Sequence, residues 1–168
     1  RGNYELILNE KDLTKWIQKI IESGVVDIDC ETTSLSATEA DIVGFSMSIE
    51  NSQACYIPLN HKGLKNQVDL NVFIEKIKII LEDNSILKIG QNIKYDFIIL
   101  KGLGVSINNM DDTMLMSYVL RTGQRGHGLD ELSSDLLFHE TIKYSDVTVV
   151  EKKKILFSEV SADKAKNY

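Results

Sequence analysis

The order of hydrophobic periods along the chain restricts the fold more than any other feature of the sequence. Two strand-like runs, residues 42–49 and 53–59, are joined by the turn residues Glu50, Asn51 and Ser52, which predicts an antiparallel hairpin. Strand-like and helical segments alternate along the rest of the chain, which is typical of parallel strand pairs. The two signals together predict an α/β fold, a mixed β-sheet flanked by helices.

The remaining elements follow from the spacing of apolar residues and from capping residues. Asn9 is the expected N-cap of a first helix that ends near Gly24. Strands are then expected at residues 25–30 and 86–89, and helices at 70–81, 93–100, 129–137 and 158–168. A further helix that ends at Leu120 is expected to be capped by Asp111 or Asp112.

Composition excludes several classes of protein. The hydrophobic fraction of 43% and the charged fraction of 26% are those of a folded globular chain rather than a disordered one. No apolar run approaches the ~20 residues that a membrane span needs. The net charge of −6 argues against a broad basic surface for nucleic acid, but a site built from carboxylates is compatible with it. Cys30 and Cys55 lie in apolar runs and are expected to be buried free thiols in a reducing compartment.

Two carboxylates at the end of the strand at 25–30 are the first candidate site. Asp29 and Glu31 are two residues apart, so their side chains share one face of a strand. Adjacent negative charges repel unless a cation lies between them, and hard oxygen ligands suit Mg²⁺ or Mn²⁺. The alternative is a solvated strand end. Asp27 lies on the same face, and we expect it to form a salt bridge or to have a raised pKa rather than to bind metal.

A second cluster, residues 90–96, follows a strand and opens a helix. The free N–H groups at a helix start favour anions. Asp96 lies about one turn into the helix and is able to face the end of the preceding strand. The alternative interpretation is an acid that complements the helix dipole.

These clusters belong to a longer ordered series of motifs. The series comprises residues 29–35, 54–59, 91–96, 112–118, 127–132 and 141–144. It resembles the proofreading 3′→5′ exonuclease domain of family A (DNA polymerase I-like) DNA polymerases, and the resemblance covers residues 4–168. Any one of the motifs alone is weak, whereas their order is specific.

The resemblance implies a ribonuclease H-like fold and a two-metal exonuclease of the DEDD class, tyrosine subtype. Asp29, Glu31 and Asp96 would be the metal ligands, with Asp29 bridging two divalent ions, Mg²⁺ or Mn²⁺. Tyr168 would hydrogen-bond the attacking water. The reaction would be hydrolysis of the terminal phosphodiester at single-stranded or frayed DNA 3′ ends, which releases nucleoside 5′-monophosphates.

The resemblance also implies a fourth carboxylate one helical turn after Tyr168, just past the last residue. We therefore expect residues 1–168 to be a single exonuclease domain that is truncated before its last catalytic carboxylate. Such a fragment would be weak or inactive by itself. The polymerase domain of the parent protein is expected to lie outside it.

Substrate contacts are carried over in the same way. Leu35 corresponds to a wedge at the terminal base, Asn92 to a polar contact and Tyr144 to an aromatic that packs on the strand. The Thr32 hydroxyl is a candidate phosphate contact, with turn formation as the alternative. Arg125 is another candidate phosphate contact, although its Gly-rich segment also fits a plain helix–helix connection.

The expected partners are the 3′ end of single-stranded DNA and a covalently linked polymerase domain. No membrane partner, a monomeric state and a cytoplasmic location are expected, with an organelle as the alternative location. Two rival functions remain open. One is a ribonuclease D-like enzyme that processes RNA 3′ ends, and the other is a non-catalytic domain that braces a polymerase.

Overall fold

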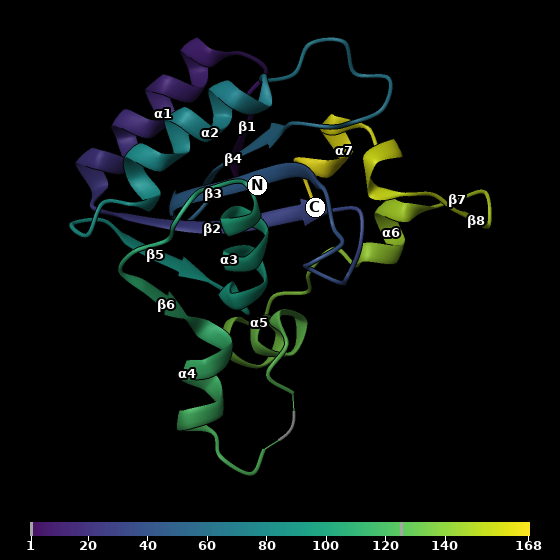
Figure 1. Cartoon of the computed structure of the whole chain (residues 1–168). Helices are drawn as coiled ribbons and strands as arrows, with labels where there is room; N and C mark the ends of the chain where they lie inside the picture. Colours follow the sequence, from purple (N-terminus) through teal and green to yellow (C-terminus); the bar gives the residue numbers. More distant parts are fainter. Residues whose placement is uncertain (1, 125) are drawn as a thin grey trace.

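A six-stranded mixed sheet forms the centre of the molecule (Figure 1). The computed structural model describes residues 2–124 and 126–168, so the expectation for Arg125 lies outside the described residues. The strands are β1 (Asn3–Leu6), β2 (Val25–Thr32), β3 (Ile42–Glu50), β4 (Gln53–Pro58), β5 (Leu87–Gly90) and β6 (Met110–Asp112). Their order in the sheet is β1-β4-β3-β2-β5-β6. Because β3 runs antiparallel to β2 and β4 while the other pairs are parallel, the predicted mixed sheet is confirmed.

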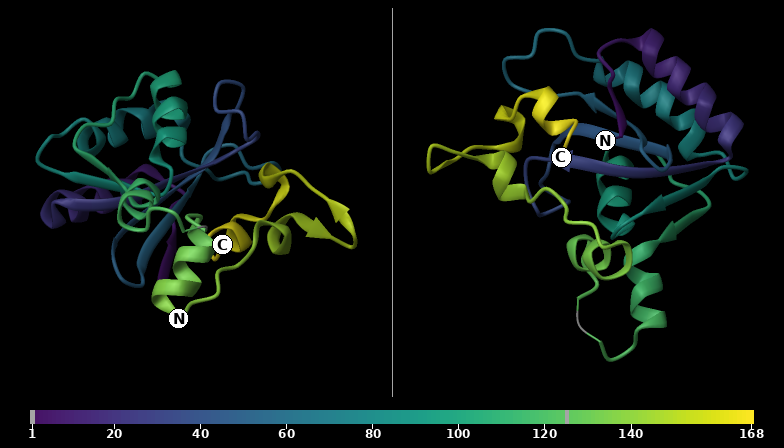
Figure 2. Two further views of the ribbon diagram at one scale, coloured as in Figure 1. Left: turned by 90° about the horizontal axis from the view of Figure 1, so that it is seen from below. Right: turned by 180° about the vertical axis from the view of Figure 1, so that it is seen from behind.

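Helices and a small hairpin surround this sheet. They are α1 (Glu10–Ser23), α2 (Leu70–Leu81), α3 (Ile93–Gly102), α4 (Thr113–Leu120), α5 (Leu129–Leu137), α6 (Tyr144–Thr148), a 3₁₀ turn (Phe157–Glu159), α7 (Ala162–Ala165), and the strands β7 (Val149–Val150) and β8 (Lys153–Lys154). The β7–β8 hairpin extends away from the body of the protein (Figure 2). Within the described residues, no helix is both long enough and apolar enough to cross a membrane.

Successive side chains of β2 point to opposite faces of the sheet. Val26, Ile28 and Cys30 are buried in the main hydrophobic cluster together with apolar residues of α1, α2 and α3. In a second hydrophobic cluster, Val43 and Tyr56 of the sheet pack against residues of the C-terminal part of the chain, namely Val147, Phe157, Val160 and Ala165. The acidic residues of β2 therefore point away from the main core, as the period of a strand requires. Cys30 and Cys55 are buried free thiols, which confirms that expectation.

Several short elements and the C-terminal segment differ from the sequence-based predictions. The strands β1, β6, β7 and β8 and the helix α6 were not predicted, because elements this short contain too few residues to display a period. The helix predicted at 158–168 is confirmed only over α7, Ala162–Ala165. Before it, a 3₁₀ turn ends at Glu159, and Val160 has an extended backbone with φ −68° and ψ 137°. Burial of Phe157 and Val160 in the second cluster outweighs local helix propensity.

Gly44 is a position where the sheet requires glycine. It lies opposite Glu31 in the β2–β3 register, and the ring of Tyr56 passes directly over its α-carbon. Tyr56 is buried and its hydroxyl forms a 2.7 Å hydrogen bond with His61 Nε2, so displacement of the ring would cost this bond and its packing. We expect Gly44→Ala to lower the free energy of unfolding by about 1–3 kcal/mol, a typical cost of overpacking.

Urea unfolding of this variant beside Gly102→Ala tests the prediction. A side chain at Gly102, the last residue of α3, meets no atom within 4 Å. The Gly102 variant should therefore unfold within about 0.5 kcal/mol of the parent chain, as surface substitutions usually do. Equal stabilities of the two variants would show that Tyr56 does not restrict position 44.

Candidate active site

The acidic face of β2 forms the floor of a large recess. Asp27, Asp29 and Glu31 line a cavity of about 840 Å³, whose walls come from α4, α5, α7 and the segment before α6. Tyr168 lines the same cavity. Asp27 and Asp29 are accessible to solvent, but the walls replace much of the bulk water around them. Three of the carboxylates singled out by their spacing thus share one concave surface.

The recess disfavours the ionised form of these carboxylates, so their pKa values are raised. Burial raises the pKa of Asp29 to about 7, and the negative charges of Asp96 and Asp27 raise it further. Burial, with the charges of Asp29 and Asp96, raises the pKa of Glu31 to about 8. Burial and the charge of Asp96 raise the pKa of Asp27 to about 6, as expected from crowding, and no salt bridge to Asp27 forms among the described residues.

Asp96 joins the group from α3. β5 pairs with β2 only as far as Asp27, so the N–H of Cys30 has no partner strand on that side. The Oδ1 of Asp96 accepts this N–H at 2.8 Å, and the residue is 2% exposed. Burial raises the pKa of Asp96 to about 6 against the opposing effect of the Cys30 hydrogen bond. The third predicted carboxylate is thereby fixed beside the strand that carries the first two.

The donor set fits a hard divalent cation. In the described part of the chain, Asp29, Glu31 and Asp96 have no cationic partner, although the charge of Asp96 raises the pKa of Asp29 and the charges of Asp29 and Asp96 raise that of Glu31. Carboxylate oxygens are the ligands that Mg²⁺ and Mn²⁺ prefer. Among residues 2–124 and 126–168, no group of three or more His, Cys, Asp or Glu side chains already has the geometry to hold an ion. Asp96 is instead turned toward Cys30.

The raised pKa values predict how stability depends on pH without metal. A carboxyl group whose pKa is higher in the folded chain than in the unfolded chain binds its proton more tightly when folded. Its stabilising contribution is complete below its ordinary pKa near 4 and is lost as pH rises through 7 or 8. We therefore expect the Tm in EDTA to fall by at least about 3 °C between pH 5 and pH 8.5.

Thermal unfolding of the chain in EDTA measures this fall. The double variant with Asp29→Asn and Glu31→Gln is the control, because it removes both titrating groups and should flatten the dependence. Saturating Mg²⁺ should raise the Tm most at high pH, where the carboxylates are ionised. A Tm that stays constant or rises from pH 5 to 8.5 would contradict the electrostatic description of the recess.

Aromatic residues gather at the C-terminal side of the recess. The rings of Tyr144 and Tyr168 lie 6.3 Å apart, and Phe157 packs against both. Burial and the charges of Glu31 and Asp29 raise the pKa of the Tyr168 hydroxyl, which keeps it protonated. Lys154 Nζ lies 6.0 Å from the centre of the Tyr144 ring. Tyr168 and Tyr144, predicted as a catalytic residue and a substrate contact, are thus brought together.

The segment after β2 presents the predicted wedge. Leu35 is 99% exposed. The hydroxyls of Thr32 and Tyr95 lie 2.5 Å apart, and each donates to the carbonyl of Ser34. The Thr32 side chain therefore stabilises the turn, which is the alternative that the sequence left open. The same bonds fix the base of the loop from which Leu35 projects.

Asn92 and Gln91 lie between β5 and α3. Asn92 is exposed, and its φ of 59° places it in the left-handed region. Gln91 was quoted in a motif but given no role. It lines the recess, donates to the carbonyl of His127 at 2.8 Å and accepts from the Thr113 hydroxyl at 2.6 Å. Gln91 belongs to the same sequence motif as Asp96, and this could have identified it as a residue of the candidate site.

Solved structures with the same fold define the class. The structure of Brucella melitensis NrnC with bound Mg²⁺ superposes with a TM-score of 0.64 at 23% identity, over 98% of this chain and 70% of that one. Escherichia coli RNase D gives a TM-score of 0.68 at 15% identity, over 85% of this chain and 36% of that one. The mixed sheet and its flanking helices are therefore the ribonuclease H-like fold of exonucleases, as the resemblance implied.

Sequence comparison gives the family. The family model described as 3′-5′ exonuclease, of the DNA polymerase A type, matches residues 4–167. DNA polymerase I of Rhizobium leguminosarum is 39% identical over 98% of this chain, and that of Pseudomonas aeruginosa is 33% identical over 99%. The chain belongs to the 3′-5′ exonuclease family found in DNA polymerase I. It spans 18% and 19% of the length of these two relatives.

Proposed function

We propose that the chain is the proofreading exonuclease part of a longer DNA polymerase I-like polypeptide. It would hydrolyse the terminal phosphodiester of a single-stranded or frayed DNA 3′ end and release a nucleoside 5′-monophosphate. One observation supports this proposal most strongly. In a chain of the 3′-5′ exonuclease family, Asp29 and Glu31 line one recess, and burial together with the negative charge of Asp96 raises the pKa of both. None of these three carboxylates has a cationic partner among the described residues.

Asp29, Glu31 and Asp96 would hold two divalent ions, Mg²⁺ or Mn²⁺, with Asp29 shared between them. Bound divalent ions lower the pKa of water and stabilise charge on the attacking and leaving oxygens. The Tyr168 hydroxyl, kept protonated beside Asp29 and Glu31, would hydrogen-bond the attacking water and orient it. Assignment to the tyrosine subtype rests on this role of Tyr168.

The substrate would lie along the exposed side of the recess. Leu35, which projects into solvent, would pack against the terminal base. Tyr144 would stack on a neighbouring base, an interaction worth about 1–3 kcal/mol per base. Asn92, exposed at the start of α3, would hydrogen-bond near the terminal nucleotide. Thr32 would act mainly by stabilising the turn that carries Leu35, with a phosphate contact as a further role.

The polymerase region of the same polypeptide is the proposed partner, since the relatives are about five times as long as this chain. It would supply the additional DNA-binding surface that a chain of net charge −6 lacks. We also propose a monomer without a membrane partner. A cytoplasmic location is proposed because the relatives are bacterial DNA polymerases.

Two measurements test the function together. Calorimetric titration should show saturable Mn²⁺ binding to the chain, and hydrolysis should be faster on a deoxyribose 3′ end than on a ribose 3′ end of the same sequence. Activity should be measured in the chain extended beyond Tyr168 to the length of its relatives. A strong preference for the ribose end would favour a ribonuclease D-like enzyme. Absence of Mn²⁺ binding and of hydrolysis would indicate a bracing domain.

A further inference from the structure

The helix that carries Asp96 starts in an unusual way. Asn92 is the N-cap residue of α3, and its φ of 59° and ψ of 43° are left-handed. N-cap residues normally have an extended backbone and accept a hydrogen bond with their own side chain. Asn92 makes no such bond, and the residue is exposed to solvent. The first N–H groups of α3 therefore need another acceptor.

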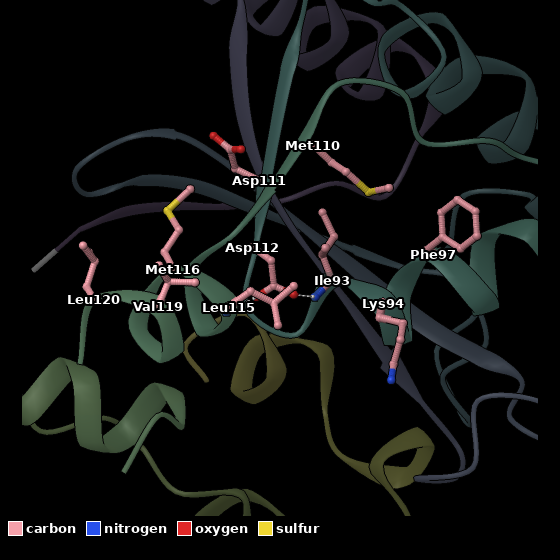
Figure 3. Close-up of a pocket in the computed structure, with 10 residues that line it drawn as sticks. All are labelled: Ile93, Lys94, Phe97, Met110, Asp111, Asp112, Leu115, Met116, Val119 and Leu120. Atoms are coloured by element: carbon pink, nitrogen blue, oxygen red, sulfur yellow. Dashed lines mark hydrogen bonds between the residues drawn. The ribbon is translucent and has the colours of Figure 1, made fainter. Parts of the chain in front are cut away.

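Asp112, at the end of β6, supplies this acceptor from a different part of the chain. Its Oδ1 accepts the N–H of Asn92 at 3.1 Å, and its Oδ2 accepts the N–H of Ile93 at 3.0 Å. Figure 3 shows Asp112 beside Ile93 with the second of these bonds drawn. The register of β5 and β6 makes the contact possible, since Asp112 pairs with Gly90, two residues before Asn92.

The same carboxylate also caps a second helix. Asp112 is the N-cap of α4, and its Oδ1 accepts the N–H groups of Met114 at 2.8 Å and Leu115 at 3.2 Å. The positive ends of two helix dipoles thus meet at one negative charge. Asp112 is only 8% exposed and lies in a pocket with apolar side chains around it, so water competes weakly for these bonds (Figure 3).

We propose that Asp112 is a positioning residue for the exonuclease reaction, an inference that rests on the proposed function. Asp112 fixes the first turn of α3, and Asp96 is the fourth residue of that helix. The position of α3 determines whether the Asp96 carboxylate reaches the N–H of Cys30 and stays beside Asp29 and Glu31. Because Asp112 caps the helix in place of Asn92, the Asn92 amide remains available to the DNA strand.

Amide hydrogen exchange in the metal-free chain tests this role without activity. In Asp112→Ala, exchange at Ile93 and at Cys30 should be at least about tenfold faster than in the parent chain, the effect of losing one hydrogen bond to a charged group on a local opening equilibrium. Asp112→Asn keeps one acceptor oxygen, so its exchange rates should lie between those of Asp112→Ala and those of the parent chain. Cys30 is the decisive position, because it is distant from Asp112 in the sequence and reports only on Asp96.

Asp69→Ala is the matched control. Asp69 caps α2 alone, accepting the N–H groups of Asn71 at 2.9 Å and Val72 at 3.3 Å. Its loss should accelerate exchange in α2 and leave Cys30 unchanged. Asp111→Ala, which removes the adjacent exposed charge, should also leave Cys30 unchanged. Measurements well below each variant's Tm separate local opening from global unfolding.

Metal affinity and kinetics provide the second readout. Mn²⁺ affinity should fall about ten- to a hundredfold in Asp112→Ala, as for other residues that hold a metal ligand in place, and kcat should fall more than KM changes. Exchange at Cys30 equal to that of the parent chain would overturn the proposal. Failure of the parent chain to bind Mn²⁺ would instead overturn the proposed function, while the Cys30 result decides the role of Asp112 by itself.

Discussion

Asp29→Ala is expected to reduce hydrolysis of a DNA 3′ end by about a thousandfold or more. Divalent ions stabilise the charge of such a transition state by several kcal/mol, and each 1.36 kcal/mol corresponds to a factor of ten in rate. Asp29 is the residue proposed to be shared between both ions, so its removal affects the whole metal set. The variant should fold, because removing a carboxylate with a raised pKa relieves repulsion in the recess.

Asp27→Ala is the control for this experiment. Asp27 lies on the same strand and the same face, two residues before Asp29, and also has a raised pKa. It is proposed not to bind metal, so its variant should retain activity within about tenfold of the parent, the lower limit of the loss seen when a residue that holds a metal ligand in place is removed. Initial rates on a single-stranded oligonucleotide at saturating Mn²⁺ provide the comparison. Equal losses in both variants would contradict the assignment of Asp29 as a ligand.

Tyr168→Phe is expected to lower kcat by about a hundredfold with little change in KM. The substitution removes only the hydroxyl, which is proposed to orient the attacking water, and positioned hydrogen-bonding groups of this kind typically contribute factors of 10²–10⁴. The aromatic contacts with Tyr144 and Phe157 are preserved, so packing should not change. Single-turnover hydrolysis with excess enzyme isolates the chemical step from product release.

Tyr144→Phe is the matched control for the hydroxyl. Tyr144 belongs to the same aromatic group, and its proposed contribution is stacking by the ring rather than hydrogen bonding by the hydroxyl. Its kcat should remain within a few-fold of the parent, whereas Tyr144→Ala should raise KM. If Tyr168→Phe and Tyr144→Phe lower kcat by the same factor, the proposed role of the Tyr168 hydroxyl in orienting water is wrong.

Local periodicity predicted the part of the site that lies on one strand. Asp29 and Glu31 share a face of β2 because the side-chain period of a strand is two, and this relationship needs no knowledge of the rest of the chain. The hairpin of β3 and β4 was likewise encoded by two runs and the turn between them. Both features depend on residues close together in the sequence.

Features that depend on distant residues were not predictable in this way. Asp111 or Asp112 was expected to cap one helix, but the sequence does not reveal that Asp112 also caps α3, because β6 itself was too short to be recognised. The contact between Asp96 and the N–H of Cys30 arises because β5 pairs with β2 only up to Asp27. The C-terminal helix is shorter than predicted, because burial of Phe157 and Val160 determines the backbone before α7.

The central claim is that the acidic recess hydrolyses DNA from its 3′ end. The most direct test uses single-stranded DNA labelled at the 5′ end, incubated with Mg²⁺ or Mn²⁺ and the chain extended beyond Tyr168, with Asp29→Ala in parallel. The account predicts a ladder that shortens progressively from the 3′ end and is absent with the variant or with EDTA. Internal cleavage, shortening from the 5′ end, or an intact strand would contradict it.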